Sequence, residues 1–243
     1  MRWIEVAGAL GMAAVAAGLQ QSPPAPQLPQ APGMPSVPAP APPVMQPPRF
    51  VVVVDAAHGG DDTGARLSGG VLEKTITLGL AARLRSTLHA RGIEVVTTRQ
   101  ADLNLPPVSR AETANEARGA ACLVIHATAT GSGVHLFTSS LTPTANARFL
   151  AWQTAQSAYV TQSLKLESEI DSALAHAAIP VTLGRASVEP MDSLTCPEVA
   201  VEVAPLVGGH VTTAKPVTDA GYQAAVANAV AAALEQWRSD WKQ

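Results

Sequence analysis

The sequence carries little net charge, no internal repeat and no long uninterrupted apolar run. Its formal charge is −3 over 243 residues, which leaves no basic surface of the kind that binds nucleic acid. The apolar stretch over residues 6–19 is too short and too rich in alanine and glycine to predict a permanent membrane span. No nucleic-acid partner is therefore expected, and a membrane is a partner only if this segment stays uncleaved.

The sequence also contains no motif typical of a serine hydrolase. Ser109, Ser132 and Ser187 do not stand in the context of a nucleophile elbow. A serine hydrolase is therefore disfavoured.

Only two cysteines are present, Cys122 and Cys196. They precede the apolar runs that carry His126 and Glu202 at similar distances. An exported protein permits a disulfide, but two half-cystines on adjacent parallel strands rarely satisfy the geometry of the bond. We therefore expect free thiols, with the disulfide as the alternative.

The N-terminal part of the chain does not belong to a folded core. Arg2 followed by the apolar residues 6–19 resembles a secretory signal, so residues 1–19 are predicted to be a signal peptide or an N-terminal anchor. Residues 20–49 are dominated by proline, alanine and glutamine, which favours an extended, disordered linker. A ligand for a partner's aromatic groove is the less favoured alternative. The expected location is exported, in the periplasm or cell envelope.

Residues 50–243 read as a single α/β domain with a mostly parallel twisted sheet flanked by helices, because short apolar runs alternate with helical patterns. Strands are expected at residues 51–54, 93–97, 121–125, 133–138 and 199–203. Leucine and isoleucine recur every four residues between Leu72 and Leu88, which predicts a helix that Gly92 ends. Further helices are expected at 107–118 and from Tyr222 to Trp237, and a long helical region, continuous or broken, is expected over about 144–177.

Two histidines stand at the ends of apolar strands, His58 after residues 51–57 and His126 after residues 122–125. Functional groups in open α/β sheets gather where parallel strands end, so both imidazoles should emerge at the same edge. A single histidine in this position is more often a packed or solvent-facing side chain than a ligand. The pair is more informative than either member.

Two glutamates complete the candidate site. Glu73 opens the helix after the Gly69-Gly70 turn, where the helix dipole alone would explain an acid. Glu202 lies inside an apolar run, where a carboxylate needs a cation, a proton or a strong donor. Two imidazoles and a carboxylate make a zinc site with a position open for water, and a further glutamate can handle that water's proton. The pattern predicts a zinc hydrolase.

The motifs around these residues resemble a known family, the zinc-dependent N-acetylmuramoyl-L-alanine amidases of the LytC and AmiC type. The resemblance covers about residues 50–238, and its motifs occur in the family's order. They are residues 53–60, 70–74, 95–99, Arg110 with Asn115, 125–129 and 201–203. The resemblance implies that His58, Glu73 and His126 hold one Zn²⁺ per chain and that Glu202 is the catalytic acid/base.

The substrate is also implied by the resemblance. It is peptidoglycan, cleaved at the amide bond between N-acetylmuramic acid and L-alanine, and an activator protein is left open as a partner. Sequence chemistry alone says only zinc-assisted amide hydrolysis. Two rivals stay open: a zinc peptidase or deacylase acting on another amide, and a non-catalytic wall-binding homologue.

Three departures from the family's pattern affect the loops around the site. Ala56-Ala57 stand where the family usually has proline and glycine, Thr128 replaces an asparagine, and residues 203–209 lack the usual aromatic and Ser-Asn pair. The four chemical positions are all present, so the departures concern the substrate groove.

Other polar residues carry weaker signals. The remaining histidines, His89, His135, His176 and His210, are interpreted as structural or exposed. Asp55 could orient a ligand or cap the following turn. Arg99, Arg110 and Asn115 match family positions that we interpret as structural.

Overall fold

Four parallel strands of a six-stranded sheet have their carboxyl ends side by side, at one end of the sheet. Among the residues that the computed structural model describes, the strand order is β2-β1-β3-β6-β4-β5. β1 (Val51–Ala56) pairs in parallel with β2 (Glu94–Thr97) and β3 (Ala121–Ala127), and β3 pairs in parallel with β6 (Glu198–Val203). His58 and His126 therefore share one edge, as the sequence predicted.

The other two strands run in the opposite direction. β4 (Val134–Ser139) lies antiparallel to β6, and β5 (Val181–Ala186) pairs in parallel with β4 at the edge of the sheet. The amino end of β4 thus lies beside the carboxyl ends of β3 and β6. The predicted mostly parallel α/β fold is confirmed.

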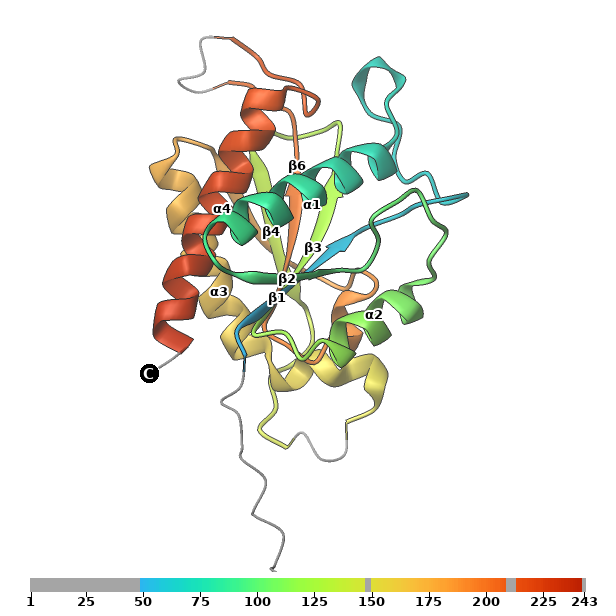
Figure 1. The fold of residues 1–243 in the computed structure, drawn as a ribbon, viewed down its shortest axis with the longest axis vertical. Helices are drawn as coiled ribbons and strands as arrows, with labels where there is room; N and C mark the ends of the chain where they lie inside the picture. The colour runs from blue at the N-terminus through green and yellow to red at the C-terminus, as the bar shows by residue number, and fades with distance from the viewer. Residues whose placement is uncertain (1–48, 147–149, 209–212, 242–243) are drawn as a thin grey trace, which may run out of the picture. The chain divides into compact units, whose positions relative to one another are not determined.

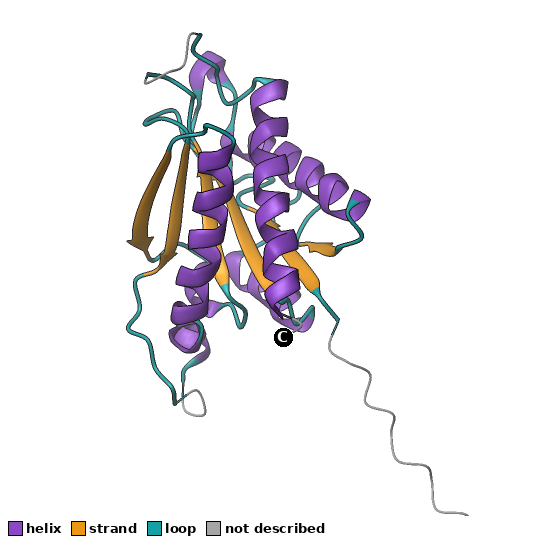
Figure 2. Cartoon of the chain, turned by 90° about the vertical axis from the view of Figure 1, so that its left-hand side faces the viewer, coloured by secondary structure: helices purple, strands orange, loops and turns teal. Residues whose placement is uncertain are grey.

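Three long helices cover one face of the sheet. α1 (Glu73–Ala90), α3 (Val160–His176) and α4 (Ala220–Trp241) pack on it and on one another (Figure 1). In Figure 2 long helices stand in front of the strands. The main core lies between these helices and alternate strand residues such as Val54, Leu123 and Val201.

The opposite face carries a smaller core. α2 (Pro107–Glu116) and the short 3-10 helix η4 (Met191–Ser193) pack against it, together with Cys122, Val124 and Ala200. Because side chains alternate along a strand, His126 and Glu202 point to this second face.

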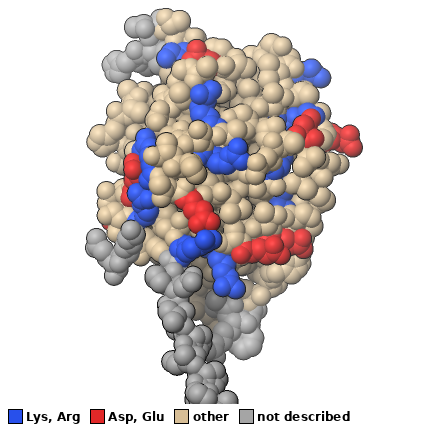
Figure 3. Space-filling view, in the orientation of Figure 1, with Lys and Arg blue, Asp and Glu red and all other residues tan. Residues whose placement is uncertain are grey.

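The structure describes residues 49–146, 150–208 and 213–241. The predicted signal segment, almost all of the predicted linker and His210 lie outside these ranges. Within them, no helix combines the length and the apolar character that crossing a bilayer requires. Charged side chains of both signs are scattered over the face shown in Figure 3.

Two features of the sequence prediction were wrong. The helical region expected over about 144–177 is broken and starts later than predicted: residues 144–146 are not helical, the 3-10 helix η3 covers Trp152–Ala158, and α3 begins at Val160. Near residue 144 the Thr144 hydroxyl accepts a hydrogen bond from the Asn146 amide, a local bond that competes with helix formation. Strand β5 was missed, because it is a half-exposed edge strand whose Leu183 is 52% exposed.

The expectation of free thiols was also wrong, since Cys122 and Cys196 form a disulfide. Their Cα atoms lie 6.0 Å apart, within the usual range for such a bond. The reason is that Cys196 precedes β6 and does not pair with Cys122, whose register partner is Glu198. The bond joins a strand to the loop that enters its neighbour.

Candidate metal centre

The loop that carries His58 is held in place by a buried arginine. His58 has a left-handed backbone conformation, with φ 64°. The Arg99 guanidinium donates hydrogen bonds to the carbonyl oxygens of Ala56 at 2.9 Å, Ala57 at 3.1 Å and Lys74 at 2.9 Å. These bonds tie the end of β1 to the first turn of α1, and so set His58 beside Glu73.

Glu73 is the central side chain of the site. One carboxylate oxygen, Oε1, lies 3.2 Å from His58 Nε2 and 2.9 Å from His126 Nδ1, and it accepts a hydrogen bond from the Ala127 amide at 3.1 Å. The other oxygen accepts from the Ala65 amide at 2.9 Å. Burial acts to raise the pKa of Glu73, but these hydrogen bonds outweigh it and hold the pKa well below its usual range. The carboxylate is therefore ionised.

His126 lies on β3, whose regular pairing with β1 and β6 fixes its backbone. Its Nδ1 faces Glu73, and its Nε2 is buried without a hydrogen-bond partner among the described residues. The strand pairing and the contact with Glu73 together orient this histidine, and among the described residues no second carboxylate contacts its ring as Asp62 contacts that of His58.

The donor atoms of His58, Glu73 and His126 lie within 4.8 Å of one another. Two imidazole nitrogens and one carboxylate oxygen are a donor set that suits Zn²⁺ in a catalytic site, where three protein ligands leave a position for water. The residues present therefore fit a metal ion of this kind. These are the three residues that the sequence pattern indicated as metal ligands.

A glycine lets the loop pass close to two of these side chains. Gly64 has φ +61°, and a Cβ there would lie 2.6 Å from His58 Cδ2 and 2.7 Å from Glu73 Oε2. Any side chain at this position would push against both. Glycine is required here for close approach as well as for its backbone conformation.

Asp62, which no sequence pattern singled out, is a neighbour of the site. Its Oδ2 lies 2.9 Å from His58 Nδ1, so it fixes the ring with Nε2 toward Glu73. The hydrogen bond with Glu73 raises the pKa of His58, against the lowering effect of burial, and Asp62 adds to the rise. Asp55, considered in the sequence for an orienting role, instead accepts hydrogen bonds from Thr98 and Arg110.

Asn115 also makes contacts that serve the fold. Its amide nitrogen donates to the Ser193 carbonyl, and its oxygen accepts from the Thr195 amide and hydroxyl. These bonds hold the segment that leads into Cys196 and β6.

Glu202 lies beside the candidate ligands. It is in register with His126 on the neighbouring strand, and adjacent strands lie about 4.8 Å apart, so the two side chains are neighbours on one face. On the other side its Oε2 lies 2.7 Å from His135 Nδ1. His135, expected from the sequence to be structural or exposed, has a side chain that is 15% exposed and contacts Glu202.

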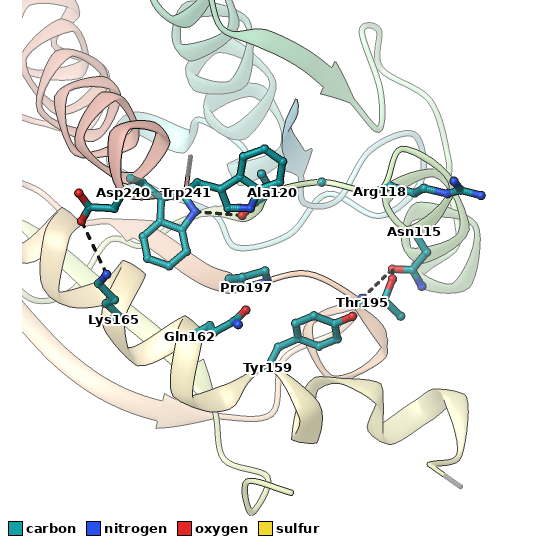
Figure 4. A pocket seen from close by; sticks show the side chains of 12 residues that line it. Asn115, Arg118, Ala120, Tyr159, Gln162, Lys165, Thr195, Pro197, Asp240 and Trp241 are labelled. Atoms are coloured by element: carbon teal, nitrogen blue, oxygen red, sulfur yellow. Dashed lines mark hydrogen bonds and ion pairs between the residues drawn. The ribbon is translucent and has the colours of Figure 1, made fainter. Parts of the chain in front are cut away.

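A large cavity elsewhere in the fold does not include these residues. It has a volume of about 730 Å³ and lies at the amino ends of β3 and β6, where Ala120 and Pro197 line it (Figure 4). Lys165 and Trp237 also line this cavity, and the Lys165 Nζ atom lies over the Trp237 ring, 5.6 Å from its centroid. The donor set at the carboxyl ends of the strands, rather than the size of a cavity, marks the candidate site.

Comparisons with known proteins identify the family of the chain. The N-acetylmuramoyl-L-alanine amidase family called Amidase_3 matches residues 52–236. AmiC of Neisseria meningitidis is 32% identical over 108 residues, which are 42% of this chain and 26% of that protein. AmiA of Escherichia coli is 40% identical over 77 residues, which are 32% of this chain and 27% of that protein.

The chain matches only about a quarter of the length of these two relatives. Among solved structures, the amidase Ami1 of Mycobacterium smegmatis has a TM-score of 0.62 at 19% identity, over 79% of this chain and 97% of that chain. At such low identity the likeness is one of fold.

Proposed function

Because the chain belongs to the N-acetylmuramoyl-L-alanine amidase family, we propose that it is a zinc-dependent hydrolase of peptidoglycan. The bond cleaved joins the lactyl group of N-acetylmuramic acid to L-alanine of the stem peptide. One observation carries the proposal: the donor atoms of His58, Glu73 and His126 converge at the edge of the sheet where Glu202 also lies.

His58, Glu73 and His126 are the proposed zinc ligands. The ionised state of Glu73 supports this role, because a carboxylate binds Zn²⁺ better than a neutral acid does. When bound, zinc supplies an acidified water and a Lewis acid for the amide carbonyl. Asp62 contacts Nδ1 of His58, and this leaves Nε2, the ring nitrogen that faces Glu73, available as a ligand.

Glu202 is the proposed general acid/base. The water oxygen attacks the amide carbon, and Glu202 accepts the proton that the water loses. As the carbon–nitrogen bond breaks, Glu202 returns that proton to the amine of L-alanine. Its partly exposed side chain, with 29% of its surface accessible, can reach both water and substrate.

The substrate lies outside the cytoplasmic membrane, so the function requires export. We include in the proposal that residues 1–19 are a signal peptide or anchor and that residues 20–49 form a spacer. The proline-rich composition of the spacer suits a segment that extends the catalytic domain toward the wall.

The proposal is tested by digesting purified peptidoglycan with the zinc-loaded chain and identifying the products by mass spectrometry. Free stem peptides that begin with L-alanine, together with glycan that keeps its lactyl group, are expected. Cleavage within the stem peptide or loss of an acetyl group would indicate the zinc peptidase or deacylase instead. Zinc binding without any cleaved bond would indicate a wall-binding protein.

Elemental analysis of the same preparation measures the zinc content per chain. About one zinc per chain is expected for the wild type, and His126→Ala should lose it. Equal zinc content in the two proteins would reject the ligand assignment.

A further inference from the structure

We propose that His135 is a positioning residue for Glu202, and that it acts by a hydrogen bond from its Nδ1–H to Glu202 Oε2. The two atoms lie 2.7 Å apart. The proposal rests on the proposed function, since it concerns the residue assigned there as acid/base. It adds a residue that neither the ligand set nor the acid/base assignment includes.

The sheet places three side chains in one row. Glu202 on β6 is in register with His126 on the parallel strand β3 and with His135 on the antiparallel strand β4. Register partners point to the same face of a sheet. The row therefore runs from a proposed metal ligand, through the acid/base, to an imidazole on the far side of it.

The end of β6 and the start of β4 are fixed to each other by the backbone. Ala204 donates to the Gly133 carbonyl, and Gly133 donates to the Pro205 carbonyl. The buried hydroxyl of Tyr222 on α4 lies 2.8 Å from the Gly133 carbonyl and 3.0 Å from the Ala204 carbonyl. These contacts set the separation of Glu202 and His135 independently of their side chains.

The imidazole of His135 is itself confined. Gly131, with φ +83°, lies so close that a Cβ there would be 2.4 Å from both Cε1 and Nε2 of the ring. The ring of Phe137 stands edge-on at 6.5 Å between centroids. His135 is thus a fixed donor beside a more exposed carboxylate, with 15% and 29% of the side-chain surfaces accessible.

The direction of the hydrogen bond follows from the chemistry of the two groups. An ionised carboxylate only accepts hydrogen bonds, so His135 Nδ1 carries the proton. Among the described residues nothing else donates to Glu202, and its Oε1 has no partner there. The bond therefore holds one oxygen and leaves the other free to take a proton from water. Without it, the carboxylate would sample other rotamers and lose alignment.

A first test needs no turnover. Long-range nitrogen–proton NMR spectra of the ¹⁵N-labelled, zinc-loaded chain report which imidazole nitrogen carries a proton, with His135→Asn used to assign the signals. The proposal expects a proton on Nδ1 of His135 in the wild type and a loss of that preference in Glu202→Leu. An unprotonated Nδ1 in the wild type would overturn it.

The second test uses two variants of nearly equal size. His135→Leu removes the donor, whereas His135→Asn places an amide nitrogen near the position of Nδ1. For His135→Leu we expect kcat on a soluble muropeptide to fall by about 10–100-fold, the loss that typically follows removal of a group that orients a metal ligand. KM and zinc content should not change, and His135→Asn should recover most of the loss.

Equal loss in both variants, or no loss in either, would overturn the positioning role. His176→Leu, at an exposed histidine on α3 that bonds only its own helix, serves as the control and should match the wild type. If the wild type itself cleaves no muropeptide, the proposed function fails, while the NMR test still decides whether His135 holds Glu202.

Discussion

Asp62 Oδ2 lies 2.9 Å from Nδ1 of His58, four residues earlier in the chain. This contact turns the other ring nitrogen of His58 toward Glu73. A carboxylate behind a histidine ligand fixes the orientation of the ring and raises its basicity. Asp62 thereby assists the proposed metal site without belonging to the ligand set.

Asp62→Ala should weaken zinc binding by about 10–100-fold, because His58 loses the partner that orients it. Competition with a chelator of known affinity measures the change, and activity should return at saturating zinc. The adjacent, exposed Asp61 offers the control Asp61→Ala, which should bind zinc as the wild type does. Identical zinc affinities for all three proteins would contradict the role given to Asp62.

The two glutamates of the site should respond differently to loss of charge. Glu202→Gln keeps the shape of the side chain but cannot take a proton, so zinc should stay bound while kcat falls by about 10²–10⁴-fold. Glu73→Gln should instead weaken metal binding, because a neutral amide is a poorer zinc ligand than a carboxylate.

Added zinc then separates the two roles. High zinc should partly restore activity to the Glu73 variant and not to the Glu202 variant. A reversed rescue pattern would mean that the two roles are exchanged, and full activity of Glu202→Gln would disprove the mechanism.

Gly64→Ala should abolish tight zinc binding, because the new methyl group would overlap with His58 and Glu73. Gly69 provides a matched control. It has a similar left-handed conformation, with φ +73°, but a Cβ there would meet nothing within 4 Å. Gly69→Ala therefore carries only the backbone strain, and should lose stability but keep its zinc. Equal zinc affinity in the two variants would show that contact at Gly64 is unimportant.

Glu198 should make the fold less stable as the pH rises. Its side chain is fully buried, and neither carboxyl oxygen has a hydrogen-bond partner among the described residues. Burial raises its pKa well above 4.5, and the nearby Asp192 and Glu167 raise it further. In the unfolded chain Glu198 ionises near 4.5, so above that pH the folded state binds more protons and the free energy of unfolding falls.

The melting temperature of the wild type should therefore drop between pH 5 and pH 8 by several degrees more than that of Glu198→Gln, since about 1 kcal/mol shifts Tm by roughly 2–4 °C in a domain of this size. Calorimetry at the two pH values measures this difference. Glu112→Gln, at an exposed position on α2, is the control and should keep the wild-type slope. A Glu198→Gln slope equal to the wild-type slope would contradict the expectation.

The sequence by itself determined the residues that meet at the candidate metal centre. His58 and His126 each end an apolar run, and the carboxyl ends of parallel strands meet at one edge of a sheet. Glu73 opens a helix whose apolar stripe shows where it begins. These are local patterns with fixed periods, and a local pattern is readable before the chain is folded.

Only the tertiary structure decided which other side chains contact those residues and whether the two cysteines bond. Asp55 and Asp62 were both near His58 in the sequence, and only the path of the loop gave Asp62 the contact with the ring. His135 reaches Glu202 because β4 runs antiparallel to β6 in one particular register. Cys196 bonds Cys122 because it precedes its strand by two residues. Strand order and register come from long-range packing, and no short stretch of sequence encodes them.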